Sequence, residues 1–108
     1  MKKVKNKVLD KVVERIRDAA GPERIVLFGS RARGDARQRS DWDLLVIARS
    51  ELPRHRRSAP LYSLLADMPG EFEVVVYTPE EAEEWSGVSE AFVTTALREG
   101  TVLYEKES

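Results

Sequence analysis

Two carboxylates one residue apart, Asp41 and Asp43, begin an apolar run that ends at Ile47. If this run is a strand, both side chains point to one face, with Cα atoms roughly 6.5 Å apart. Both could then hold one divalent cation or share two, and oxygen ligands favour a hard ion such as Mg²⁺. The alternative is a pair of solvated residues at a strand edge, which is the commoner meaning of an isolated Asp-x-Asp.

A second signal lies at Gly29-Ser30, which follows the apolar run Ile25–Phe28. Glycine allows a positive φ and a close backbone approach to a ligand, and Ser30 suits the N-cap of a helix starting at Arg31. Free N–H groups at a helix start bind anions, and Arg31 and Arg33 add positive charge for phosphate oxygens. The alternative is an ordinary strand-to-helix turn.

Glu73 is the candidate for a third acidic ligand. It lies within the apolar run that extends to Tyr77. A carboxylate inside such a strand is costly to bury unless it is paired or bound to a metal. Glu71, nearer to the preceding loop, is the alternative.

Hydrophobic periodicity predicts the elements that must position these residues. Apolar residues at steps of four, from Val4 to Ile16, favour a helix over Lys3–Ala20. Both faces of the run after Asp43 are apolar, which favours a central strand. Alternating strands and helices predict an α/β (α+β) fold, with helices packed on a small mixed β-sheet. The predicted strands are Arg24–Phe28, Asp41–Ala48, Glu71–Tyr77 and Thr101–Tyr104; the other predicted helices are Leu61–Met68, Pro79 to about Trp85, and Ser89–Arg98, the last with Phe92, Val93, Ala96 and Leu97 inside.

Two arginine-rich segments connect these elements. Residues 31–39 lie beside the carboxylate pair, which favours a phosphate-facing wall over a merely solvated loop. Residues 49–59, which contain Pro53, are predicted to form a mobile basic loop with His55 at the surface.

Composition and length favour one compact domain over residues 1–108. With 42% hydrophobic and 34% charged residues, the chain reads as globular, and the absence of cysteine excludes disulfides and thiolate metal ligands. No apolar run reaches the length of a membrane span and no signal peptide is evident, so we expect a cytoplasmic protein without membrane contact. Because the net charge is −1, direct binding of nucleic acid would require a local basic patch.

The pattern G-S-x3-G-x5-S-D-x-D-L-L-V, from Gly29 to Val46, resembles the signature of the DNA polymerase β-like nucleotidyltransferase superfamily. The chain is most similar to its small, single-domain members, the minimal nucleotidyltransferases (MNT) of bacteria and archaea. The likeness continues through residues 73–81 and 98–105. It implies a polymerase β-like palm and the Mg²⁺-dependent transfer of a nucleoside monophosphate, such as AMP from ATP, to a hydroxyl with release of pyrophosphate.

The resemblance also implies roles for individual residues. Asp41 and Asp43 would bridge two Mg²⁺ ions, while Glu73, where relatives commonly have Asp, would hold the second ion or accept a proton. The catalytic and metal-binding set is therefore Asp41, Asp43 and Glu73. The nucleotide-binding set is Gly29, Ser30, Arg31, Arg33 and Ser40.

The same resemblance implies a partner. Minimal nucleotidyltransferases resemble one half of a two-gene pair whose other half is a HEPN-family protein, and they act as antitoxins, in some cases by adding AMP to the HEPN toxin. The chain has no room for further domains, so we expect acceptor choice to depend on such a partner or on a homo- or hetero-oligomer. The alternative is a non-catalytic module that neutralises its partner by contact. A small-molecule nucleotidyltransferase of the aminoglycoside type ranks lower, because no second lobe is present to bind a drug.

Overall fold

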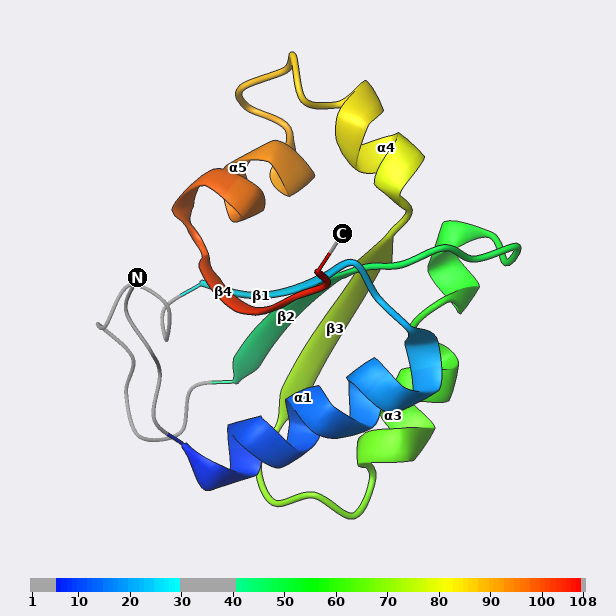
Figure 1. The fold of residues 1–108 in the computed structure, drawn as a ribbon, viewed down its shortest axis with the longest axis vertical. Helices are drawn as coiled ribbons and strands as arrows, with labels where there is room; N and C mark the ends of the chain where they lie inside the picture. Colours follow the sequence, from blue (N-terminus) through cyan, green and yellow to red (C-terminus); the bar gives the residue numbers. More distant parts are fainter. Residues whose placement is uncertain (1–5, 30–40, 108) are drawn as a thin grey trace.

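A four-stranded mixed sheet forms the centre of the protein (Figure 1). The computed structural model describes residues 6–29 and 41–107. β1 is antiparallel to both β2 and β4, whereas β2 and β3 are parallel and are joined by a crossover connection. This arrangement confirms the predicted α/β fold class. The strands are β1 (Arg24–Phe28), β2 (Trp42–Ile47), β3 (Phe72–Tyr77) and β4 (Thr101–Glu105), in the order β3-β2-β1-β4.

Helices cover both faces of the sheet (Figure 1). One face carries α1 (Lys7–Ala20) and α3 (Ala59–Leu65), and the other carries α4 (Pro79–Glu84) and α5 (Phe92–Glu99). Among the described residues, no helix combines the length and the apolar character needed to cross a membrane.

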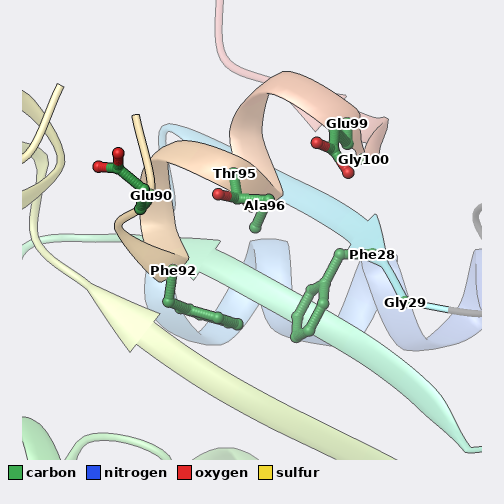
Figure 2. Close-up of a pocket in the computed structure, with 8 residues that line it drawn as sticks. All are labelled: Phe28, Gly29, Glu90, Phe92, Thr95, Ala96, Glu99 and Gly100. Atoms are coloured by element: carbon green, nitrogen blue, oxygen red, sulfur yellow. The ribbon is translucent and has the colours of Figure 1, made fainter. Parts of the chain in front are cut away.

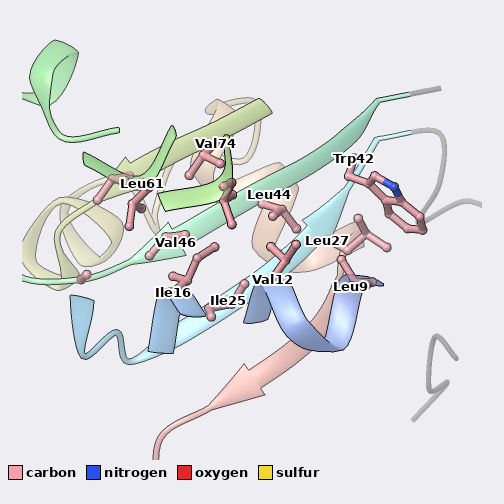
Figure 3. Close-up of a cluster of buried hydrophobic side chains, with 13 residues drawn as sticks. Leu9, Val12, Ile16, Ile25, Leu27, Trp42, Leu44, Val46, Leu61 and Val74 are labelled. Carbon is pink, nitrogen blue, oxygen red and sulfur yellow. The ribbon is translucent and has the colours of Figure 1, made fainter. Parts of the chain in front are cut away.

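Alternating side chains of the strands divide the buried residues into two cores. On the α5 face, Val26, Leu45 and Ile47 pack against Val93 and Ala96. The larger core lies between the sheet and α1 with α3 (Figure 3). Because β2 contributes to both cores, it is the central strand that its apolar sequence predicts. The larger core contains Leu9, Val12, Ile16, Ile25, Leu27, Trp42, Leu44, Val46, Ala48, Leu61, Leu65, Val74 and Val76.

Two helices begin later in the chain than predicted. α1 starts at Lys7 rather than Lys3, because Asn6 has an extended backbone and its side-chain oxygen accepts a hydrogen bond from the Leu9 N–H at 3.0 Å. This N-cap marks the helix start. α5 starts at Phe92 rather than Ser89, because the backbone of Ala91 is extended.

The short helix α3 is shifted toward the N-terminus relative to its predicted range, Leu61–Met68. It begins at Ala59, with Pro60 in its first turn, where a residue without an N–H is tolerated. It ends at Leu65, so Met68 lies beyond it and is a partly buried residue packed against the larger core.

The segment from 49 to 59, predicted to be a mobile basic loop, contacts the rest of the protein through Arg54 and Arg57. It contains the 3-10 helix η1 (Arg54–Arg56), and the Arg54 guanidinium lies 5.0 Å from the centre of the Tyr77 ring. Arg57 is nearly buried, and it donates to the Leu52 carbonyl at 2.9 Å and to Glu81 Oε1 at 2.5 Å. These contacts attach the segment to β3 and α4.

The Arg57–Glu81 pair predicts a pH-dependent stability. The hydrogen bond from Arg57 is the main cause that holds the pKa of the Glu81 carboxyl below its ordinary value. A lowered carboxyl pKa stabilises the fold above the pKa of the unfolded chain, and this contribution is lost as the pH falls through the folded pKa. Glu81→Gln keeps an acceptor for the Thr78 N–H but removes the charge. We expect it to lower the free energy of unfolding by about 1–2 kcal/mol at neutral pH.

Urea unfolding of parent and Glu81→Gln from pH 7 to about pH 3 measures this effect, since unfolded glutamate titrates near pH 4. The difference between the two proteins should shrink in acid. Glu84→Gln, an exposed site on the same helix, is the control and should change little. A difference that does not vary with pH would exclude the charge as its cause.

Candidate active site

The strand register brings three site positions side by side. Asp43 on β2 pairs with Phe28 on β1 and with Glu73 on β3. Paired positions on neighbouring strands point to the same face and lie about 5 Å apart. The next row of the register, Val26, Leu45 and Val75, belongs to the core beneath α5, so Asp43 and Glu73 lie on the α5 face at one end of the sheet.

Asp41 lies just outside this strand end. It is exposed and immediately precedes β2, whose first N–H, on Trp42, donates to the Glu71 carbonyl at 2.9 Å. Asp43 is half-buried. The arrangement gives one carboxylate within the sheet and one at its rim, at the start of the same strand.

Glu73 is exposed, so the cost of burying a carboxylate, on which its prediction as a ligand rested, does not apply. β3 is an edge strand of the sheet, so no burial cost requires this carboxylate to have a partner or a metal. Its register beside Asp43 is the feature that favours it as a third acidic residue. The alternative, Glu71, lies before β3, where its carbonyl accepts the hydrogen bond from Trp42.

Gly29 directly follows β1 and lies next to the Asp43 carboxylate. Its φ is +77°, a conformation that favours glycine. A Cβ atom at this position would collide with Asp43 Oδ2. The Gly29 backbone therefore approaches the carboxylate more closely than any other residue would allow. Ser30, Arg31, Arg33 and Ser40, the other predicted nucleotide-binding residues, lie outside the described residues.

The acidic residues offer the oxygen donors that Mg²⁺ prefers. Within residues 6–29 and 41–107, no three or more histidine, aspartate or glutamate side chains converge as a metal site. Mg²⁺ typically binds through one or two carboxylates completed by substrate phosphates and water, and not through an all-protein cage. By its chemistry, the set of Asp41, Asp43 and Glu73 fits such an ion.

A pocket of about 310 Å³ borders this site, and the sequence motifs did not predict it (Figure 2). Phe92, predicted to be inside the protein, is 43% exposed and forms part of the pocket wall. Its ring meets the Phe28 ring edge-on, with centres 5.1 Å apart. We name this cavity the α5 pocket; its lining residues are Phe28, Gly29, Glu90, Phe92, Thr95, Ala96, Glu99 and Gly100.

A family profile matches most of the chain. The sequence profile of the family described as Polymerase beta, Nucleotidyltransferase matches residues 10–108. A candidate protein adenylyltransferase of Methanocaldococcus jannaschii is 45% identical over 56 residues. That alignment covers 50% of this chain and only 37% of the relative, so the chain spans well under half of that protein.

Three solved structures have a similar fold. A candidate nucleotidyltransferase from Sulfolobus solfataricus has a TM-score of 0.67 and 21% identity, covering 94% of this chain and 81% of its own. A toxin–antitoxin structure with AMP-PNP has a TM-score of 0.54 and 21% identity, covering 91% and 73%. BolA1 from Arabidopsis thaliana has a TM-score of 0.55 and 15% identity, covering 72% and 98%. At these identities the similarities establish the fold alone.

Proposed function

The chain belongs to the polymerase beta nucleotidyltransferase family, as its Gly-Ser and Asp-x-Asp motifs predict, and we propose that it transfers AMP from ATP to a hydroxyl group. The observation that carries this proposal is the contact between the Gly29 backbone and the Asp43 carboxylate, with Glu73 in register beside it. Together these residues put an expected phosphate-binding turn next to an acidic pair on one face of the sheet.

The carboxylates would bind metal and move a proton. Asp41 and Asp43 would hold Mg²⁺, in one or two positions, and the bound ion would neutralise charge on the transferring phosphoryl group. Glu73 would hold a second ion or accept the proton of the attacking hydroxyl. As the hydroxyl oxygen bonds to the α-phosphorus, the bond to the bridging oxygen breaks and pyrophosphate leaves.

The Gly-Ser turn would hold the phosphates. The Gly29 backbone lies against Asp43, and Ser30 is the next residue in the sequence. Ser30, Arg31, Arg33 and Ser40 carry the hydroxyls and positive charges that bind phosphate oxygens. Catalysis would then consist mostly of positioning and charge neutralisation.

The acceptor is proposed to be a hydroxyl on a HEPN-family partner protein, with this chain as the antitoxin. Two comparisons support a protein acceptor and a toxin–antitoxin setting: the Methanocaldococcus relative named for protein adenylyl transfer and the toxin–antitoxin structure solved with AMP-PNP. The HEPN identity of the partner rests on the resemblance of residues 29–46 to minimal nucleotidyltransferases. The test is to co-purify the native protein with its partner, add Mg²⁺ and ATP labelled at the α-phosphate, and follow the label. A partner that acquires no label would contradict the proposal.

The proposed metal site predicts that Mg²⁺ and ATP together raise the melting temperature. A ligand that binds only the folded protein stabilises it, by about 2.7 kcal/mol at one hundred times its dissociation constant. Thermal melting with Mg²⁺-ATP is compared with melting in ATP plus EDTA, and Mg²⁺ alone is the control. Equal melting temperatures with and without the metal would remove the metal site from the proposal.

A further inference from the structure

The α5 pocket adjoins the site of the proposed reaction at one end only. Gly29, which contacts the Asp43 carboxylate, lines this end together with Glu99 and Gly100. Phe92 and Glu90 line the other end (Figure 2). A nucleotide whose phosphates lie at Gly29 and Asp43 could therefore extend its uncharged part along the pocket toward Phe92.

The ring of Phe92 is held in place before any ligand binds. It packs edge-on against Phe28 and lies 6.1 Å from the Tyr77 ring, centre to centre, at an angle of 32°. The cation of Arg54 covers the Tyr77 ring. Phe92 nevertheless leaves 43% of its surface exposed, and an exposed ring with fixed neighbours is a preorganised stacking surface.

Negative charge at the Phe92 end of the α5 pocket disfavours phosphate there. Glu90 and Glu99 lie at opposite ends of the cavity (Figure 2), and carboxylates repel a triphosphate but accept hydrogen bonds from neutral N–H groups. The Arg98 guanidinium makes an ion pair with Glu99, with Nη2 and Oε2 3.1 Å apart, and offsets part of the negative charge at the Gly29 end. The Glu90 carboxylate, which lines the Phe92 end, is therefore matched by a base that carries an amino group.

The segment that carries Glu90 is fixed to α5. The hydroxyl of Thr95 and the guanidinium of Arg98 both donate to the Ser89 carbonyl, each at 3.3 Å. The Thr94 hydroxyl donates to the Trp85 carbonyl at 2.6 Å. Glu90 is thus attached to a braced turn, which suits a residue that distinguishes one base from another.

We propose that the α5 pocket binds the base of the nucleotide, with the ring stacked on Phe92 and its exocyclic amino group donating to Glu90. This assignment rests on the proposed nucleotidyl transfer and adds to it a preference for adenine over bases that lack an amino group. The phosphate-binding residues and the acidic set of Asp41, Asp43 and Glu73 take no part in that preference.

The first test measures stacking. Phe92→Ala should weaken Mg²⁺-ATP binding by roughly tenfold, the scale of losing one base–aromatic stack, while tripolyphosphate, which has no base, binds as it does to the parent. Phe92→Tyr should retain ATP affinity. Trp85→Ala is the matched control, because Trp85 is an equally exposed aromatic residue outside the pocket, and it should change neither affinity.

The second test measures the amino-group contact. The parent should bind ATP about tenfold more tightly than purine riboside triphosphate, which lacks only the 6-amino group, as expected for a hydrogen bond to a charged acceptor. Glu90→Gln should reduce this preference, whereas Glu84→Gln should keep it.

Three results would overturn the proposal, and they differ from one another. If ATP binds but Phe92→Ala leaves its affinity unchanged, the base lies elsewhere and the proposed function survives. If Phe92→Ala lowers only transfer to the partner, the α5 pocket holds the acceptor instead of the base. If neither ATP nor tripolyphosphate binds the folded parent, the proposed function fails and the assignment fails with it.

Discussion

Replacing Asp43 with asparagine should lower nucleotidyl transfer by about a hundredfold or more, the scale of losing one preorganised electrostatic group. Asparagine keeps the shape of the side chain and removes its negative charge. That charge matters most in the transition state, where a metal-bound phosphoryl group is being transferred.

The same substitution should leave the fold intact. The neighbours of Asp43 on the strand, Trp42 and Leu44, are buried in the core on the opposite face of the sheet. Asp43 itself is half-buried at the end of β2, so the change is nearly isosteric and lies outside both cores. Repulsion between Asp41 and Asp43 should also decrease when no metal is bound.

The measurement is paired: transfer of labelled AMP to the partner, and affinity for the partner, in parent and Asp43→Asn. Affinity should change little. Asp67→Asn is the control, because Asp67 makes an exposed ion pair with Arg15 on the α1 side of the sheet. If neither parent nor Asp43→Asn transfers AMP and both neutralise the partner equally, the catalytic proposal is wrong and the chain is a binding module.

The sequence predicted the elements of this site better than their arrangement. Strand periodicity put Asp43 on the face opposite Trp42 and Leu44, as the register shows, whereas Asp41, predicted to begin the strand, precedes β2. The glycine of the Gly-Ser pair allows the positive φ that Gly29 has. The strand order was not readable, because pairing between β1, β2 and β3 depends on contacts between residues far apart in the chain. The position of Glu73 beside Asp43 is a consequence of that order.

Local sequence patterns gave the wrong burial for residues at the edges of the fold. Glu73 sits in an apolar run, yet it is exposed because β3 has a neighbouring strand on one side only. Phe92 has helical spacing with buried Val93 and Ala96, yet it projects toward Phe28 at the α5 pocket. The composition around Arg57 predicts only a basic loop, because sequence spacing carries no sign of its ion pair with Glu81.

Gly29→Ala should reduce both stability and transfer, and the two effects have different causes. A residue with a Cβ at φ +77° costs about 1–2 kcal/mol, which corresponds to several degrees of melting temperature in a domain of this size. The added Cβ would also collide with Asp43 Oδ2, so the carboxylate must move. A displacement of about 1 Å at a reacting site can lower the rate by about a hundredfold.

Gly21→Ala separates these two causes. Gly21 ends α1 with a φ of +54°, and a Cβ at Gly21 would meet no atom within 4 Å. It should therefore show a comparable loss of melting temperature with nearly full AMP transfer. Both variants are assayed at a temperature where thermal melting finds them folded. If Gly29→Ala then transfers AMP as well as Gly21→Ala does, the contact between Gly29 and Asp43 serves only the fold, and the observation on which the proposed function rests loses its catalytic meaning.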